Sequence, residues 1–270
     1  MKIGKATRPR TAISTSNAER IVVRGADLCD ELIGHVSFGD YFWFLLTGAK
    51  PDPAASAVLN ATLVAIAEHG LVPSVQAARM TLAAAPDAMQ GAVAAGVLGS
   101  GSVILGASET AGRLFDDIDR AAGRDGDLLA AARDAVARLR AAKQAIPGYG
   151  HPLHKARDPR VARLFEVSRA AGGGQRFVQI AEAVEAAIPG VVGKDLKLNV
   201  SAAIPAVLLG VGFPLNALKG VPMLARTASL IAHLSEELDD PIGFALSYQA
   251  TREQEYTGAV PEGFVPGHGT

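Results

Sequence analysis

From residue 26 onward, apolar side chains recur every three or four positions, and this spacing constrains the fold more than any other feature of the chain. It is the period of one face of an α-helix. The repeats are separated by short segments rich in glycine and proline, which end helices. No alternating apolar and polar run is long enough for a sizeable sheet. The sequence therefore predicts an all-α protein.

Residues that cap or break helices give the expected boundaries. We expect helices at residues 26–36, 38–47, 53–68, 74–85, 88–98, 109–122, 127–145, 161–171, 175–187, 199–210 and 221–238. Residues 1–25 show no periodicity and are expected to form an extended arm. The tail from Thr257 contains prolines and glycines and is expected to lie over the surface.

The composition places limits on compartment and partners. With 270 residues, 49% of them hydrophobic, the chain can form one large domain or two unequal ones. Its formal net charge of −1 argues against nucleic acid or an anionic membrane as partner. The longest apolar run, residues 202–215, is shorter than the roughly 20 residues that cross a bilayer. The N-terminus lacks a signal-peptide pattern, and the single Cys29 excludes an internal disulfide. We expect a cytoplasmic protein in which Cys29 is buried.

One segment departs from the helical pattern and concentrates polar groups. Residues 146–160 read IPGYGHPLHKARDPR. Gly148 and Gly150 allow the backbone to turn tightly around His151, a side chain that exchanges protons near neutral pH. The cations that follow are Lys155, Arg157 and Arg160. Each of them alone could be a solvated surface charge, but the cluster beside His151 favours a site that binds an anion.

Other polar groups have simpler explanations. His69 lies at a helix end, where a histidine can satisfy free carbonyl groups. His233 lies within a helix and is expected to be hydrogen-bonded in a core or an interface. The Gly99–Ser102 turn lacks the lysine of a phosphate-binding loop. His151 and His154 lie on a proline-containing loop without a nearby carboxylate pair, so we expect no metal.

Taken in order along the chain, these segments resemble the citrate synthase family, including citryl-CoA lyases and the C-terminal part of ATP citrate lyase. Residues 148–160 resemble the second-histidine motif of the family. Residues 68–71 resemble an Asp-His-Gly segment of the family, and residues 94–99 resemble its first-histidine segment. Residues 198–201 resemble the segment with the catalytic aspartate, and residues 224–233 resemble a stretch that supplies a substrate-binding arginine. The likeness covers residues 25–258, and the chain's length is similar to that of stand-alone lyases.

The resemblance implies a two-domain helical fold. The large domain would comprise residues 1–104 and 207–270, and a small mobile domain, residues 105–206, would carry the His151 loop. The active site would lie between them, and the protein would be a homodimer or a higher homo-oligomer. The implied ligands are coenzyme A, as a thioester substrate or product, and a small polycarboxylate of the citrate or oxaloacetate type.

The same resemblance assigns roles by position. His151 would exchange a proton with the oxygen on the carbon where the bond forms or breaks. The polycarboxylate would be bound by His69, Arg160, Arg226 and Arg252, the last donated across the dimer although it is one position out of step. Coenzyme A would lie near Gly148, Gly150, Lys155 and Arg157.

Two positions depart from the family pattern. Gly99 stands in place of the first histidine, and Ser201 stands in place of the catalytic aspartate. A serine hydroxyl is too weak a base at neutral pH to remove the proton α to a thioester. The half of the site that enolises acetyl-CoA is therefore expected to be missing, unless Asp195 replaces it, while the half that holds carboxylates remains.

Three functions follow from this reading. The leading hypothesis is a citryl-CoA-lyase-like enzyme that cleaves, or in reverse condenses, a 3-hydroxy-3-carboxyacyl-CoA, with His151 taking the hydroxyl proton. The second is an impaired homologue that binds a CoA thioester or a polycarboxylate as a regulatory or partner subunit. The third is a citrate or methylcitrate synthase, against which Gly99 and Ser201 argue.

Overall fold

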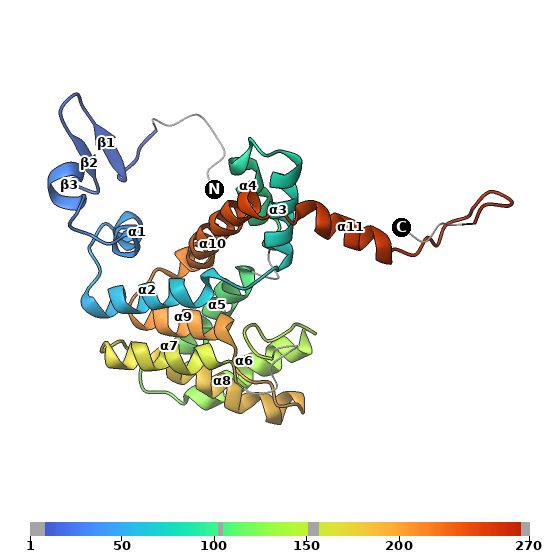
Figure 1. Cartoon of the computed structure of the whole chain (residues 1–270). Coiled ribbons are helices and arrows are strands. Elements are labelled where there is room, and N and C mark those ends of the chain that lie inside the picture. The colour runs from blue at the N-terminus through green and yellow to red at the C-terminus, as the bar shows by residue number, and fades with distance from the viewer. Residues whose placement is uncertain (1–8, 102–104, 151–156, 266–270) are drawn as a thin grey trace.

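The computed structural model describes residues 9–101, 105–150 and 157–265. In these ranges a small N-terminal sheet is followed by helices throughout, which confirms the all-α class (Figure 1). The helices are α1 (Phe38–Thr47), α2 (Pro53–Ala67), α3 (Pro73–Ala84), α4 (Met89–Leu98), α5 (Gly106–Ala122), α6 (Leu128–Ala141), α7 (Pro159–Ala170), α8 (Arg176–Val192), α9 (Val200–Gly210), α10 (Gly220–Asp239) and α11 (Gly243–Glu253). None of these described helices is both long and apolar enough to cross a membrane.

Local capping explains why several helices begin where the sequence predicts. The Ser37 hydroxyl accepts a hydrogen bond from the Asp40 amide at the start of α1, and Gly48, with a φ of 79°, ends that helix. Asp52 caps α2 in the same way. Asn199 caps α9 by accepting from the Ser201 amide at 2.9 Å. Side-chain acceptors at these positions satisfy amides that have no partner inside the helix.

The N-terminal region differs from the prediction. Residues 26–36 do not form a helix, and residues 1–25 are not wholly an extended arm. Strands β1 (Ser14–Ser16), β2 (Ile21–Val23) and β3 (Ala26–Asp27) pair antiparallel in that order, and the single π-helical turn η1 (Leu28–Leu32) follows. Asp27 caps this turn by accepting from the Cys29 and Asp30 amides. Cys29 is exposed, not buried, because it lies on the outside of this turn.

Two further expectations were wrong at the C-terminal side. Pro189 does not end α8, which continues to Val192 and stops at Gly193 in the left-handed conformation. A proline so close to the end of a helix removes one of its last hydrogen bonds only. Helix α11 was not expected, because its larger apolar side chains are exposed in the single chain and give no buried stripe.

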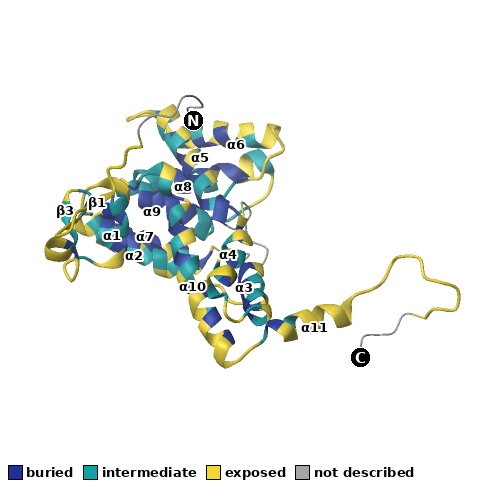
Figure 2. Ribbon diagram, turned by 90° about the horizontal axis from the view of Figure 1, so that it is seen from above, coloured by how far each residue is buried: buried dark blue, intermediate teal, exposed yellow. Residues whose placement is uncertain are grey.

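Three apolar clusters hold the fold together (Figure 2). The largest joins α2 with α5–α9, and α9 lies at its centre because Ala202–Leu208 are all buried. A second cluster joins α3, α4 and α10. A third, around Val23, Leu32 and Phe44, holds the N-terminal sheet against α1. The division into domains at residues 104/105 and 206/207 stays a prediction.

A buried ion pair fixes the chain where α10 turns into α11. Arg79 Nε on α3 lies 2.6 Å from Glu237 Oε2 on α10, and the side chains are 3% and 2% exposed. Glu237 also accepts from the Ile242 and Gly243 amides, and Arg79 donates to the Asp240 carbonyl. Burial disfavours the charged carboxyl, but the bonds from Ile242, Arg79 and Gly243 outweigh it and lower the pKa of Glu237. The pair therefore sets the direction in which α11 leaves the body (Figure 1).

The Glu237→Ala substitution is expected to lower the free energy of unfolding by about 3–5 kcal/mol at pH 7, because it leaves a buried guanidinium without its partner. Urea unfolding followed by circular dichroism measures this loss. Glu236→Ala is the matched control, since Glu236 also bonds Arg79 but is 61% exposed. Its removal should cost at most about 1 kcal/mol. Equal losses in the two variants would contradict the role given to the buried pair.

Candidate active site

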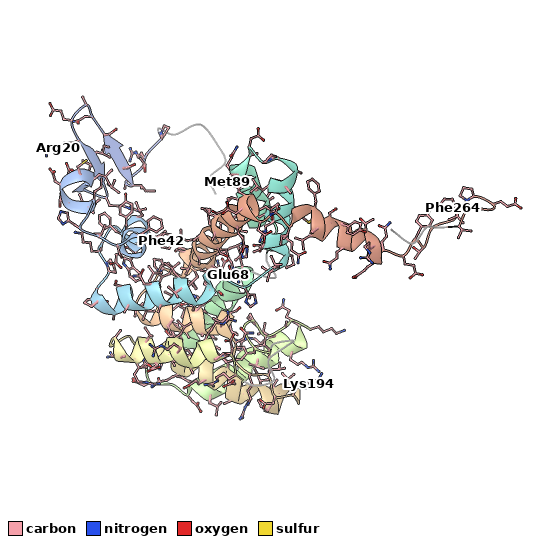
Figure 3. All side chains as sticks on the ribbon, viewed as in Figure 1. Arg20, Phe42, Glu68, Met89, Lys194 and Phe264 are labelled. Carbon is pink, nitrogen blue, oxygen red and sulfur yellow. The ribbon has the colours of Figure 1, made fainter. Side chains whose placement is uncertain are left out.

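Three segments that are far apart in sequence come together where α2 ends beside α10. They are the Glu68–Gly70 turn after α2, Arg226 on α10 and Arg160 on α7. Glu68 is labelled at this junction in Figure 3. Burial lowers the pKa of Arg226, nearby Glu68 raises it and nearby Arg160 lowers it again. Helix α2 packs against both α7 and α10, and Arg226 reaches the Ala67 carbonyl at the end of α2. Together with the electrostatic effect of Arg160 on Arg226, this packing indicates that the two predicted cations share one neighbourhood.

Arg160 is held in a fixed orientation by Asp158, the capping residue of α7. Arg160 Nε and Nη2 lie 3.0 and 2.8 Å from the two oxygens of this carboxylate. Burial opposes ionisation of Asp158, but its bonds from Arg160 and from the Val200 amide lower its pKa. A guanidinium has five N–H groups, and the Nη1 hydrogens of Arg160 have no hydrogen bond to another described residue. Asp158 thereby links the first turn of α7 to the first turn of α9.

Arg226 is more available than Arg160. Its one hydrogen bond to another described residue is a long one, 3.5 Å from Nη1 to the Ala67 carbonyl. A half-buried guanidinium with few internal partners is well suited to bind a carboxylate through two parallel hydrogen bonds.

Glu68 brings an acidic group into this cationic site. Its Oε2 accepts from Ser229 Oγ at 2.6 Å and lies 3.0 Å from His233 Nε2, and its Oε1 accepts from the Gly70 amide. Burial opposes ionisation, but the bonds from Ser229, Gly70 and His233 lower the pKa of Glu68 to about 2. The Glu68 side chain is 57% exposed, so this ion pair contributes only about 0–1 kcal/mol to stability. The hydrogen bond of His233 confirms the prediction for that residue.

The glycine-rich segment before His151 is bound to the start of α9. The Gly150 amide donates to the Lys197 carbonyl at 2.7 Å, and the Asn199 amide donates to the Gly148 carbonyl at 3.0 Å. Asn199 Nδ2 donates to the Gly150 carbonyl at 2.8 Å. Both glycines have a φ of 84°, a conformation that side chains disfavour. Tyr149 between them is buried and donates to the Ala181 carbonyl.

The predicted residues His151 and Lys155 lie outside the described residues. The chain reaches His151 directly from Gly150, which is fixed next to Asn199. Ser201, two residues farther along, is half-buried in the first turn of α9. The Gly148–Gly150 segment therefore lies next to the start of α9, where Ser201 is found.

Asp195 and Gly99 are the residues that bear on the expected loss of the enolising groups. Asp195 is 59% exposed and its Oδ2 lies 2.8 Å from Lys197 Nζ. Gly99 ends α4 with a φ of −68°, and a side chain there would meet Ala95 and Ser74 at ordinary contact distance. The backbone at residue 99 thus has the space and the conformation for a Cβ atom, although the chain has a glycine there.

A cationic hollow of about 650 Å³ lies at the end of α6, just before the glycine-rich segment. It is lined by Arg140, Ala141, Lys143, Gln144 and Ala145. Lys143 has a φ of 55°, which is unusual for a lysine. Arg157, expected near coenzyme A, instead bonds Glu185. Arg140 and Lys143 are therefore cations near the predicted cofactor segment that sequence reasoning missed.

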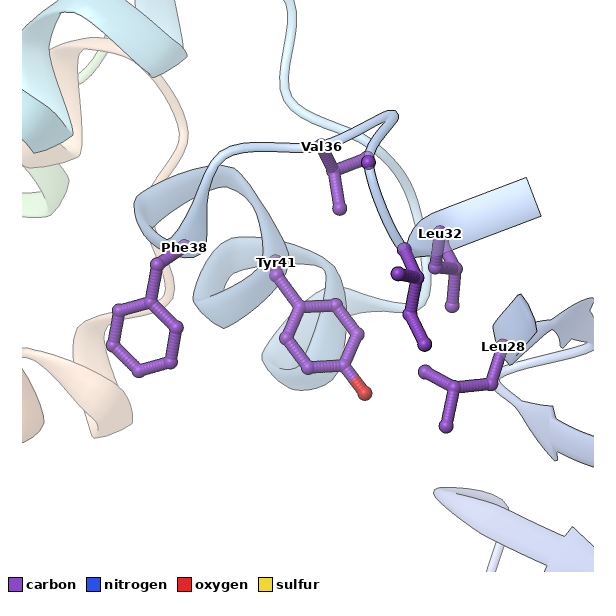
Figure 4. A pocket seen from close by; sticks show the side chains of 7 residues that line it. Leu28, Leu32, Val36, Phe38 and Tyr41 are labelled. Carbon is purple, nitrogen blue, oxygen red and sulfur yellow. The ribbon is translucent and has the colours of Figure 1, made fainter. Parts of the chain in front are cut away.

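Arg252 is not brought to the other predicted residues within one chain. It lies on α11, which projects from the body, and its guanidinium carbon is 5.8 Å from the centre of the Tyr248 ring (Figure 1). A separate hollow of about 220 Å³ in the N-terminal region, lined by Leu28, Leu32, Ile33, Gly34, Val36, Phe38 and Tyr41, has no charged lining residue (Figure 4). It does not suit a polyanion.

Sequence reasoning also missed the groups that support the cations. Asp158 and Glu68 lie within the motifs, but the sequence assigns them no role. Ser229 and His233 follow Arg226 at spacings of three and seven residues, which places all three on one face of α10. That spacing was the one signal in the sequence from which the network could have been found.

Comparison with known proteins identifies related sequences and structures. The family described as "Citrate synthase, C-terminal domain" matches residues 10–243. A citrate synthase of Haloferax volcanii is 27% identical over 214 residues, which are 78% of this chain and 53% of that protein. The chain thus spans about half the length of the curated relatives that it matches.

Two solved structures show the same fold. The citryl-CoA lyase of Hydrogenobacter thermophilus has a TM-score of 0.83 and 33% identity, over 95% of this chain and 97% of that chain. An ATP citrate lyase of Methanosaeta concilii has a TM-score of 0.72 and 22% identity, over 88% of this chain and 40% of that chain. The citrate-synthase-like helical fold is therefore confirmed.

Gly148→Ala is expected to destabilise the protein by about 2–5 kcal/mol, because the added methyl group would lie 2.4 Å from the Ala202 side chain on a backbone of unfavourable φ. Gly150→Ala is the matched control, since it has the same φ but its nearest contact would be 3.5 Å from Leu196. It should cost roughly 1–2 kcal/mol. Urea unfolding of both variants measures the difference, and equal losses would contradict the close approach to α9.

Proposed function

Because the chain belongs to the citrate synthase family, we propose that it is a citryl-CoA-lyase-like enzyme that cleaves a 3-hydroxy-3-carboxyacyl-CoA such as citryl-CoA. The observation that carries this proposal is a site that keeps cations for carboxylates but has a serine at the position of the base. Arg160 and Arg226 share one neighbourhood next to the Glu68–Gly70 turn, while Ser201 replaces a carboxylate at the start of α9. The 33% identity to a citryl-CoA lyase supports the same reading.

The proposed reaction begins on the hydroxyl side of the substrate. Arg160, Arg226 and His69 bind the carboxylates of the citryl group. His151 removes the hydroxyl proton, and the bond between the carbinol carbon and the carbon α to the thioester breaks. The electron pair passes to the thioester as an enolate, which water protonates to acetyl-CoA. The carbinol oxygen becomes the ketone of oxaloacetate, so no base is needed at Ser201.

Coenzyme A is proposed to lie along the glycine-rich segment. Gly150 is only partly buried, and the hollow that contains Arg140 and Lys143 precedes the glycine-rich segment in sequence. Cations in such a hollow suit the phosphates of the cofactor. Lys155 keeps its proposed role, whereas Arg157 would have to leave Glu185 to take part.

A homodimer is proposed for this activity. Helix α11 and the residues after it expose Phe244, Tyr248, Tyr256, Phe264 and Val265. A second copy would cover these apolar side chains. It would also bring Arg252 to a site that it cannot reach in its own chain.

Two other functions compete with the lyase. A binding or regulatory subunit is favoured by the absence of both enolising groups. A citrate synthase is favoured by the names of the curated relatives. Exchange of the acetyl-CoA methyl protons with solvent separates the three. Cleavage of citryl-CoA without exchange supports the lyase, and exchange supports the synthase. Citrate that raises the melting temperature without either reaction supports the binding subunit.

His151→Ala is expected to lower the kcat of citryl-CoA cleavage by about 10²–10⁴-fold, because it removes the group that takes the hydroxyl proton. Release of oxaloacetate, coupled to malate dehydrogenase, measures the rate. His35→Ala is the control, since His35 is an exposed histidine outside the site. Activity of the His151 variant within a few-fold of wild type would contradict the assignment.

Ser201→Asp is expected to raise proton exchange at the methyl carbon of acetyl-CoA by on the order of 10²-fold, because it restores a carboxylate base at the start of α9. Deuterium incorporation followed by mass spectrometry measures it. Ser201→Asn has the same shape without a base and should show no gain. If the aspartate variant also shows no gain, Ser201 does not occupy the position of the base.

A further inference from the structure

Glu68 is an acidic group in a place that disfavours one. It lies at the C-terminal end of α2, where the free carbonyl groups of a helix repel a carboxylate. It also lies near Arg226, in a site for which a polyanionic ligand is proposed, so its charge would repel that ligand. The proposed reaction gives Glu68 no chemical step. Its presence therefore calls for another role.

The contacts of Glu68 divide between two parts of the chain. Ser229 and His233 on α10 bind one carboxylate oxygen, and the Gly70 amide binds the other. The carboxylate thus joins α10 to the backbone just beyond α2. His69 lies between the two attachment points, since Glu68 and Gly70 are its neighbours in sequence.

The donors on α10 also define where Arg226 lies. Arg226, Ser229 and His233 lie at positions three and four residues apart and so share one face of the helix. Holding Ser229 and His233 therefore holds this face, with Arg226 on it, towards the Glu68–Gly70 turn. The negative charge of Glu68 also acts favourably on the positive charge of Arg226.

His233, the partner of Glu68, also lies next to a second network of charged groups. His233 Nδ1 lies 3.8 Å from Glu236 Oε2, and that oxygen lies 2.6 Å from Arg79 Nη1. Arg79 is buried and bound to Glu237. His233 is thus held between Glu68 and a fixed ion-pair network, so the carboxylate of Glu68 has a rigid partner.

We propose that Glu68 is a positioning residue that holds His69 and Arg226 at the spacing needed to bind the carboxylates of the substrate. It does not touch the substrate. This inference rests on the proposed function and deepens it, because it names a determinant of polycarboxylate affinity. The Glu68 side chain is largely exposed and contributes little to stability. It therefore affects the placement of His69 and Arg226 and not the folding of the chain.

The test compares Glu68→Ala, Glu68→Asp and the control Glu166→Ala, an exposed carboxylate on α7 that pairs with Arg163. Binding of citrate alone is measured by calorimetry. We expect Glu68→Ala to weaken binding about tenfold or more, since a small misplacement of binding groups is costly. Its melting temperature should stay within about 2 °C of wild type. Glu68→Asp should recover most of the affinity, and Glu166→Ala should leave it unchanged.

In the cleavage assay, Glu68→Ala should raise KM more than it lowers kcat. Citrate binding by Glu68→Ala within twofold of wild type would overturn the inference. So would a loss of affinity matched by a large drop in melting temperature and not recovered by aspartate, because that pattern indicates a structural role. If wild type neither binds citrate nor cleaves citryl-CoA, the proposed function fails, and this inference fails with it.

Discussion

The burial of α9 is the constraint on which the site depends. Ala202–Leu208 are buried, and α2, α5, α7 and α8 pack around them. The position of the first turn of this helix is therefore set by that packing. The Val200 amide contributes to the lowered pKa of Asp158, and Asn199 binds the Gly148–Gly150 segment on the other side. Arg160 and the chain leading to His151 are positioned from the same few residues, so apolar packing is what gives the polar site its geometry.

The fold could be predicted from the sequence because the information is local. Ser37, Asp52 and Asn199 mark helix starts through bonds to amides two or three residues away, and such signals are visible in a short window. The misses arose where the deciding interaction is distant or absent. Residues 26–36 are shaped by strand pairing, and α11 has its larger apolar side chains exposed in the single chain. Neither feature leaves a buried stripe with helical spacing.

The candidate site could also be predicted from the sequence only in part. Resemblance of short motifs was enough to select Arg160 and Arg226, and the structure brings both to one neighbourhood. The groups that orient them could not be selected, because Glu68 meets Ser229 and His233 across more than 160 residues of chain. A motif identifies groups that touch a ligand, whereas the groups behind them are fixed by packing. The role of Glu68 can for that reason be recognised only from the structure, in which the end of α2 lies beside α10.

Under the proposed lyase function, the hydroxyl-side groups act at the citryl oxygen, where the carbon–carbon bond breaks. The remaining proton transfer then passes between the thioester enolate and water. A catalyst lowers the barrier of a step and of its reverse equally, so the loss of a carboxylate base slows this transfer in both directions and does not shift the equilibrium. Exchange of the acetyl-CoA methyl protons is the reaction that depends most on that base, because it begins with the removal of a proton from carbon.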